Sequence, residues 1–181
     1  MSEKSEKEIR QLIKKAQKGD AEAFGLVYDN FLDRIYRFIY LKVSNREEAQ
    51  DLAQQAFMKA WEAINGFEDE GLPFSSWLYR IARNLVIDFY RVQKNNVSLD
   101  EGIGIMHPDD LEERMFKSQK QEEIRKALRD LTDEQRDIII LRFVDDLSYK
   151  EIGKITKKNP AALRILQHRA INKLRKSVKT K

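Results

Sequence analysis

The segment from Phe74 to Arg91, FSSWLYRIARNLVIDFYR, constrains the fold of this chain more than any other part of the sequence. At a helical turn of about 100° per residue, its apolar side chains gather on one broad face, as a helix packed on a core requires. These side chains are Trp77, Leu78, Ile81, Ala82, Leu85, Val86 and Phe89. The pattern therefore predicts a long core helix in this segment.

The other side of this helix is unusual in a chain of which 35% is charged, because it holds neither Lys nor Glu. Its members are Arg80, Arg83, Asn84, Asp88 and Arg91, with Ile87 among them. Arg and Asn offer rigid, directional donors to phosphates and base edges. The indole of Trp77, at the border, can stack on an unpaired base. Taken alone, the segment fits two interpretations equally well: a nucleic-acid reader, or a core helix whose arginines pair with nearby carboxylates.

Helical periods continue along most of the chain, whereas strand alternation is nearly absent. In the first half, helices are expected over about 4–18, 21–43 and 44–64, with Asp20 as the cap of the second. Capping boxes are predicted for Ser44 with Glu47, Thr132 with Gln135, and Ser148 with Glu151. The sequence therefore predicts an all-α fold class: a helical bundle over residues 1–95, an acidic flexible linker over residues 96–116, and a smaller helical domain over residues 117–181.

The charges of the chain are unevenly distributed. It has 34 basic and 30 acidic side chains, so the net charge of +4 is mild. From Lys157 to Lys181, however, nine residues are Lys or Arg and none is acidic, while Val97 to Glu113 holds six acids and no Lys or Arg. Such segregation is typical of separate surfaces for separate partners.

Several classes of function are disfavoured by what the sequence lacks. The chain has no Cys, which excludes disulfides and thiolate chemistry and suits a reducing cytosol. Its first residues lack the apolar core of a signal peptide, and no run is long and apolar enough to span a bilayer. We therefore expect a cytoplasmic protein without membrane insertion. His107 and His168 are far apart, and no nucleotide-binding or metalloprotease motif is present, so no catalytic residue, metal or cofactor is expected.

Two short helices across a tight turn are predicted near the C-terminus. Ser148 to Thr156 is amphipathic, a polar turn follows, and Pro160 suits the first position of the next helix. This arrangement fits a helix-turn-helix with a strongly basic second helix. Its outward side chains include Arg164, Ile165, His168 and Arg169. Arg suits guanine and an exposed Ile suits a thymine methyl. A basic helix that contacts nothing is the less favoured alternative.

The helix expected over residues 44–64 suggests a protein partner. Its alanine stripe, formed by Ala49, Ala53, Ala56, Ala60 and Ala63, permits close packing on a neighbouring helix. Beside this stripe lie Gln50, Asp51, Gln54, Phe57, Met58 and Trp61. Aromatic groups with a polar fringe are typical of a docking patch. Composition alone favours the alternative, in which Phe57 and Trp61 belong to the core.

Three sequence blocks, taken in order and spacing, narrow the choice. They are AQDLAQQAFMKAWEAI from Ala49, FSSWLYRIARNLVIDFYR from Phe74, and LTDEQRDIIILRFVDDLSYKEIGKI from Leu131, which leads into NPAALRILQHRAINKLRK. Together they resemble the extracytoplasmic-function (ECF) sigma factors, the compact bacterial class with only the second and fourth sigma regions. The resemblance covers nearly the whole chain outside the linker and the extreme N-terminus.

The resemblance implies a role for each block. The first would dock on the clamp helices of the largest subunit of core RNA polymerase, through Asp51, Gln54, Phe57 and Trp61. The second would read and melt the proximal promoter element, through Trp77, Arg80, Arg83, Asn84, Asp88 and Arg91. The loop from Glu68 to Pro73 would capture a flipped base. The third would bind the distal element as duplex DNA, through Arg164, Ile165, His168 and Arg169.

Further expectations follow from the same resemblance. Arg136 and Arg142 would contact phosphates or the flap of the second-largest polymerase subunit, and an anti-sigma factor is the usual antagonist. Some residues depart from the family pattern. Gln50 and Gln55 stand where acids are common, and Gly153 stands where Ala is usual, which should loosen its helix slightly. Ile165 and Leu166 replace residues that are often polar.

The sequence therefore predicts a promoter-specificity subunit with no catalytic activity of its own. The alternative is a stand-alone helix-turn-helix regulator that binds duplex DNA without entering polymerase. A third possibility is an interaction protein, such as an anti-sigma-like scaffold, whose basic tail is incidental.

Overall fold

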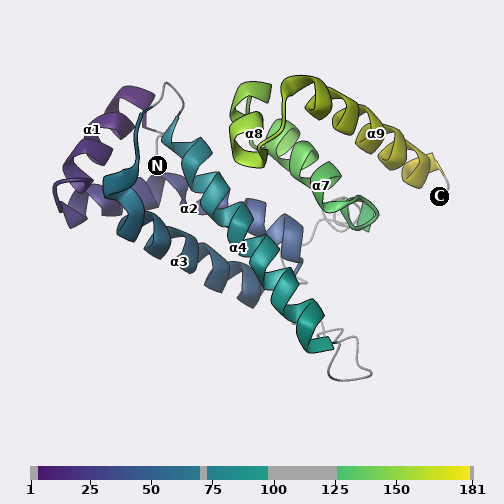
Figure 1. Ribbon diagram of the computed structural model, residues 1–181, viewed down its shortest axis with the longest axis horizontal. Coiled ribbons are helices and arrows are strands. Elements are labelled where there is room, and N and C mark those ends of the chain that lie inside the picture. The colour runs from purple at the N-terminus through teal and green to yellow at the C-terminus, as the bar shows by residue number, and fades with distance from the viewer. Residues whose placement is uncertain (1–3, 70–72, 98–125, 180–181) are drawn as a thin grey trace.

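The computed structural model describes residues 4–69, 73–97 and 126–179, and these form helices joined by short turns (Figure 1). No strand occurs within these ranges. The predicted all-α fold class with two helical domains is confirmed. Apart from its first two residues, the predicted linker over 96–116 lies outside the described residues. Among the helices of the described part, none is both long and apolar enough to cross a membrane.

Four helices form the N-terminal bundle. They are α1 (Glu6–Ala16), α2 (Ala21–Val43), α3 (Arg46–Ala63) and α4 (Phe74–Val97), and a 3-10 turn, η1 (Ile64–Gly66), follows α3. Helix α2 packs on the other three and buries residues at helical spacing from Val27 to Ile39 (Figure 1). The predicted apolar face of α4 is the core face, since Leu78, Ala82, Leu85 and Val86 are buried. This helix continues six residues beyond the predicted end at Arg91.

Side-chain caps define the starts of the first three helices. Ser5 and Glu8 form a capping box at α1, which was not predicted. Asp20 is the predicted cap of α2, and it accepts a hydrogen bond from the Ala23 N–H. The predicted Ser44–Glu47 box at α3 is wrong by one residue. The cap is Asn45, whose Oδ1 accepts from the Glu48 N–H at 3.1 Å. Ser44 instead ends α2 in the left-handed conformation, with φ 57°, whereas the N-cap residue of a helix is normally extended.

The C-terminal half contains α7 (Asp133–Ile139), a π-helical turn called η2 (Ile140–Val144), α8 (Tyr149–Thr156) and α9 (Pro160–Lys179). Residues 126–129 are also helical. The predicted capping boxes at α7 and α8 are confirmed. Helix α9 packs on α7 and α8 and buries Leu163 and Ala170 in the core (Figure 1).

The turn between α8 and α9 has the predicted helix-turn-helix form. Lys157 ends α8 in the left-handed conformation, and its N–H and that of Lys158 both donate to the Gly153 carbonyl. Asn159 then caps α9, because its Oδ1 accepts from the Ala162 N–H at 2.8 Å. A Cβ added at Gly153 would lie 2.8 Å from the Lys158 carbonyl oxygen. The glycine therefore permits the close approach of this turn to α8, a reason that the sequence pattern did not reveal.

The two halves of the molecule pack directly on each other. Helix α4 lies against α8, and α2 contacts η2 (Figure 1). Because α4 carries the polar arc predicted to read DNA, this packing decides which of its side chains are free to meet a partner.

Candidate nucleic-acid interface

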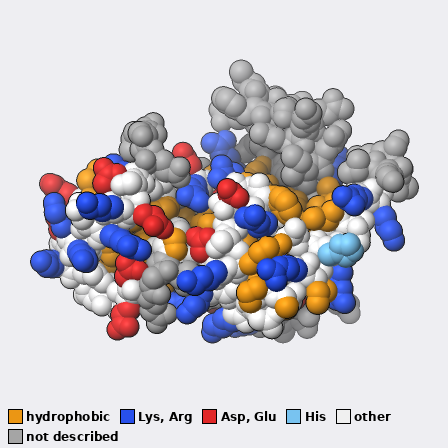
Figure 2. All heavy atoms as spheres, turned by 90° about the horizontal axis from the view of Figure 1, so that it is seen from above, with side chains coloured by type: hydrophobic (Ala, Val, Ile, Leu, Met, Phe, Trp, Pro, Cys, Tyr) orange, Lys and Arg blue, Asp and Glu red, His pale blue; other side chains and the backbone are white. Residues whose placement is uncertain are grey.

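The outward face of α9 carries the residues predicted to meet duplex DNA. Ile165 is 54% exposed, and Arg164, His168 and Arg169 are exposed around it. The guanidinium of Arg164 lies over the ring of Tyr149, 5.2 Å from its centroid, and this cation–π contact orients the side chain. On the C-terminal side, Figure 2 shows hydrophobic side chains and a histidine interspersed among Lys and Arg. Basic groups for phosphates and apolar groups for base methyls thus share one surface.

The polar arc of α4 is only partly open to solvent. Asn84, Asp88 and Arg91 are exposed, and the last two form an ion pair of 3.1 Å within the helix. Trp77 is half-buried, with its ring centroid 5.4 Å from that of Phe67 and 5.3 Å from that of Phe74. The indole therefore belongs to an aromatic cluster at the start of α4, with part of its surface free.

A small hollow of about 180 Å³ lies beside this indole. Its walls include residues 66–68, Trp77 and Arg80 from the N-terminal bundle and Lys154 from α8. Aromatic and cationic groups of this kind stack on bases and attract the sugar-phosphate backbone. Residues 70–72, in the loop predicted to capture a flipped base, lie outside the described residues.

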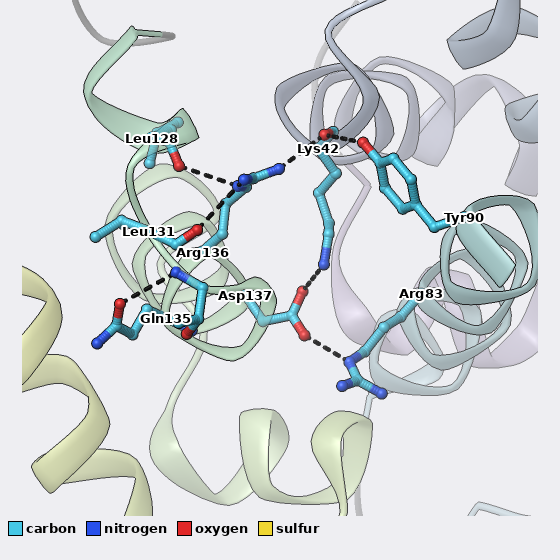
Figure 3. A network of polar contacts seen from close by, with 9 residues as sticks. Lys42, Arg83, Tyr90, Leu128, Leu131, Gln135, Arg136 and Asp137 are labelled. Carbon is cyan, nitrogen blue, oxygen red and sulfur yellow. Dashed lines mark hydrogen bonds and ion pairs between the residues drawn. The ribbon is translucent and has the colours of Figure 1, made fainter. Parts of the chain in front are cut away.

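Arg83 differs from the rest of the arc because it is paired with the other half of the molecule. Its Nε lies 2.7 Å from Oδ2 of Asp137 in α7. The other carboxylate oxygen, Oδ1, is bound by Nζ of Lys42 at the end of α2 (Figure 3). The side chains of Lys42 and Asp137 are each 1% exposed. In this arrangement the Nε of Arg83 is paired with Asp137 and the side chain is 16% exposed, so separation of the two halves would free it for its predicted role.

Arg136 and Arg142, expected at phosphates or at the polymerase flap, make internal contacts here. Arg136 donates to the Leu128 carbonyl at 3.1 Å and, across the two halves, to the Lys42 carbonyl at 3.0 Å (Figure 3). Arg142 donates to the Leu147 carbonyl at 2.9 Å. Both guanidinium groups therefore serve as hydrogen-bond donors to backbone carbonyls in this structure.

A second carboxylate joins the halves at Asp145, directly after η2. Arg37 Nη2 donates to its Oδ1 at 3.0 Å, and Arg34 donates to its backbone carbonyl at 3.2 Å. Burial raises the pKa of the Asp145 carboxyl, and the hydrogen bond and charge of Arg37 oppose this rise. Burial also raises the pKa of the Tyr79 hydroxyl, and the negative charge of Asp145 adds to the effect. None of these four residues stands out in the sequence, because their contacts join positions far apart in the chain.

Beside this contact, α1, α2 and residues 144–147 border a cleft of about 890 Å³. Ile9, Ile13 and Phe31 contribute apolar surface to it, and charged residues of both signs line it from both halves of the molecule. The cleft is large enough to receive a segment of a partner protein.

Helix α3 divides the four residues predicted to dock on polymerase. Asp51 and Gln54 are exposed, whereas Phe57 is only 3% exposed and packs on Tyr28, with 4.6 Å between ring centroids. Trp61 is half-buried, with its ring centroid 5.0 Å from that of Phe24. The core interpretation therefore holds for Phe57. Met58, which is 62% exposed, is the large apolar group that α3 presents to solvent.

The described residues include no group of three or more His, Asp or Glu placed to hold a metal ion. Three surfaces remain as candidate binding sites: an exposed basic and apolar face on α9, a partly covered polar arc on α4 and an exposed polar stretch of α3.

The chain matches two family descriptions that coincide with the two halves. Residues 27–96 match Sigma-70 region 2, and residues 127–176 match Sigma-70, region 4. The two matches and the all-α fold therefore define a protein of the sigma-70 class with these two regions.

Comparison with individual proteins identifies the family of this chain within the sigma-70 class. The ECF RNA polymerase sigma factor SigW of Bacillus subtilis is 35% identical over 186 residues, which cover 94% of this chain and 97% of SigW. BldN, an ECF RNA polymerase sigma factor of Streptomyces coelicolor, is 32% identical over 170 residues, which cover 92% of this chain and 64% of BldN. The chain belongs to the ECF family of RNA polymerase sigma factors.

The same fold occurs in the sigma factor of a solved complex. It is the sigma factor RpoE bound to the anti-sigma factor NepR from Bartonella quintana, with 28% sequence identity and a TM-score of 0.74. The superposition covers 86% of this chain and 96% of RpoE.

Proposed function

We propose that this chain binds core RNA polymerase, directs it to specific promoters and helps to melt them. One observation carries the proposal: a single chain holds both an exposed basic and apolar face on α9 and a polar arc on α4 beside the hollow at Trp77. The first suits duplex DNA and the second suits unstacked bases. A stand-alone regulator of duplex DNA would need only the first.

The two DNA surfaces have separate tasks. Residues 117–181 bind the distal promoter element through Arg164, Ile165, His168 and Arg169, with α9 in the major groove. Residues 1–95 bind the proximal element and trap unstacked bases at Trp77 and Arg80, with Asn84, Asp88 and Arg91 further along the arc. Arg83 joins this second surface once the halves separate. Residues 96–116 connect the two domains.

The polymerase contact is proposed for the exposed part of α3. Asp51 and Gln54 face solvent and remain the primary candidates for the clamp helices of the largest subunit. Met58 is added to them because of its exposure, while Phe57 and Trp61 support the helix from within the bundle. The flap of the second-largest subunit is the proposed partner of the C-terminal domain.

The proposal also includes a protein that inhibits the chain and the compartment in which the chain acts. An anti-sigma factor is the proposed antagonist, and the cleft bordered by α1, α2 and residues 144–147 is its candidate site, because both halves line it. The chain acts in the cytoplasm, where polymerase and promoters meet, and contributes no catalytic group of its own.

Transcription with purified components tests the proposal. The chain is added to core polymerase together with fragments of genomic DNA, and specific transcripts are sequenced. Promoter-dependent transcripts are expected only when both the chain and core polymerase are present. A chain that shifts duplex DNA by itself and yields no transcript with polymerase would instead be a stand-alone regulator. A chain that does neither would be an interaction protein.

A further inference from the structure

Two cations of the N-terminal bundle hold one carboxylate from both sides. Lys42 Nζ binds Oδ1 of Asp137, and Arg83 Nε lies 2.7 Å from Oδ2 (Figure 3). Lys42 comes from the last turn of α2 and Arg83 from the middle of α4, whereas Asp137 comes from α7. The cations thus belong to one half of the molecule and the anion to the other.

Both cations are carried by helices of the N-terminal bundle that are tied to each other. The Tyr90 hydroxyl on α4 donates to the Lys42 carbonyl at 2.8 Å, which ties the end of α2 to the helix that carries Arg83. Helices α2 and α4 also pack on each other along the bundle core. The backbone positions of Lys42 and Arg83 therefore stay close together when Asp137 withdraws.

Two adjacent positive charges in a partly buried position need an anion. The Lys42 side chain is 1% exposed and that of Arg83 is 16% exposed while the halves are packed. Removing Asp137 while the halves stay packed would leave an uncompensated buried charge. In the separated form the two cations repel each other, and an anion between them offsets this repulsion. Asp137 provides the compensation in the packed form, and separation of the halves leaves the position empty.

The geometry of the site suits a phosphodiester. Its two non-bridging oxygens can be shared between two donors as the two carboxylate oxygens are here, and charge-assisted hydrogen bonds to Arg and Lys are the usual way to hold such a group. Arg83 also directly precedes the exposed Asn84 on the arc proposed to face opened DNA. A DNA strand along this arc brings its backbone to the site.

We propose that Lys42 and Arg83 form a phosphate-binding site for the DNA backbone, which Asp137 of the same chain occupies while the two halves are packed together. The inference rests on the proposed function, since the DNA reaches this arc during promoter binding. Asp137 and the phosphate compete for one site, so the same two cations serve the closed form and the DNA-bound form.

The test measures binding of the full-length chain to a fluorescent single-stranded DNA of random sequence, about 30 nucleotides long, by anisotropy at several salt concentrations. Asp137→Asn is expected to bind this strand roughly tenfold tighter than Asp29→Asn, with a salt slope steeper by about 0.7. Asp29 is exposed on α2, so its variant is matched in charge. Adding Lys42→Gln to Asp137→Asn should abolish the gain. Adding Lys59→Gln, at an exposed lysine of α3, should preserve it.

Two outcomes overturn the site. One is equal affinity of the Asp137→Asn and Asp29→Asn variants. The other is a gain that survives Lys42→Gln, because the gain would then come from general exposure of α4. If circular dichroism shows that Asp137→Asn loses helix, Lys42→Gln and Lys59→Gln are compared within polymerase holoenzyme on promoter DNA. A shallower salt slope for Lys42→Gln alone supports the site, and equal slopes refute it.

Failure of this inference is separable from failure of the proposed function. Wild-type chain with core polymerase is assayed for promoter-dependent transcription in parallel. Transcription without a Lys42-dependent DNA contact refutes the phosphate site alone, whereas absence of transcription refutes the proposed function.

Discussion

Replacement of Gly153 by Ala has two opposing effects on the free energy of unfolding, one from helix propensity and one from the tight turn of the helix-turn-helix. In the interior of a helix, Ala is favoured over Gly by about 1 kcal/mol. At Gly153, however, the new Cβ would lie 2.8 Å from the Lys158 carbonyl oxygen, a backbone atom of a turn closed by two hydrogen bonds to the Gly153 carbonyl. Forcing a methyl group into such a tight space costs about 1–3 kcal/mol. We therefore expect Gly153→Ala to lower the free energy of unfolding by about 1 kcal/mol.

Gly25 provides the matched control. It lies within α2, is exposed, and has no atom within 4 Å of an added Cβ. Gly25→Ala should therefore raise the free energy of unfolding by about 1 kcal/mol, through helix propensity alone. Urea denaturation followed by circular dichroism measures both variants against the wild type. Equal stabilisation by the two substitutions would refute the argument, because it would mean that the turn accommodates the Cβ without strain.

Three further predictions concern the binding surfaces and the contact between the halves. Asn84→Ala should reduce open-complex formation and leave polymerase binding unchanged, since its amide is proposed to read a base; permanganate footprinting checks this, and unaltered melting contradicts it. Arg164→Ala should cost about 1–3 kcal/mol of discrimination at one position of the distal element, whereas a uniform loss over a panel of duplex sites would indicate a phosphate contact. The pKa of Asp145 is raised in the folded state, so protonation of this carboxyl favours folding. The wild type should therefore gain stability relative to Asp145→Asn as the pH falls from about 7 towards about 4, the pKa of Asp in the unfolded chain. Urea midpoints at several pH values measure this, and a difference that does not vary with pH opposes it.

Local features of the fold could be predicted because their causes lie within a few residues. The capping boxes at Thr132 and Ser148 join groups three positions apart, and both are present. The error at the start of α3 is also local, since the left-handed conformation of Ser44 passes the cap to Asn45. Helical periodicity likewise identified the core face of α4.

Contacts between the halves could not be predicted in the same way. Tyr79 lies outside the apolar stripe of α4, yet it is fully buried. Its burial, like the pairing of Arg83 with Asp137, depends on groups far away in the sequence. The α4 segment had two interpretations, a nucleic-acid reader or a core helix whose arginines pair with carboxylates. Arg83 fits the second in this structure, where it is paired with Asp137, and it is proposed to fit the first once the halves separate. Phe57, which the family resemblance assigned to the docking patch, is only 3% exposed, as the composition of α3 alone favoured.

The π-helical turn η2 restricts how this region can change in evolution. The Asp145 N–H donates to the Ile140 carbonyl at 3.1 Å, five residues back, so the turn holds one residue more than an α-helical turn would. Deleting a residue between Ile140 and Val144 would rotate the preceding side chains by about 100° relative to those that follow. Asp145 would then lose its position opposite Arg37. Substitutions in this turn are therefore more readily tolerated than length changes, because only a length change removes Asp145 from Arg37 while the other contacts between the halves remain.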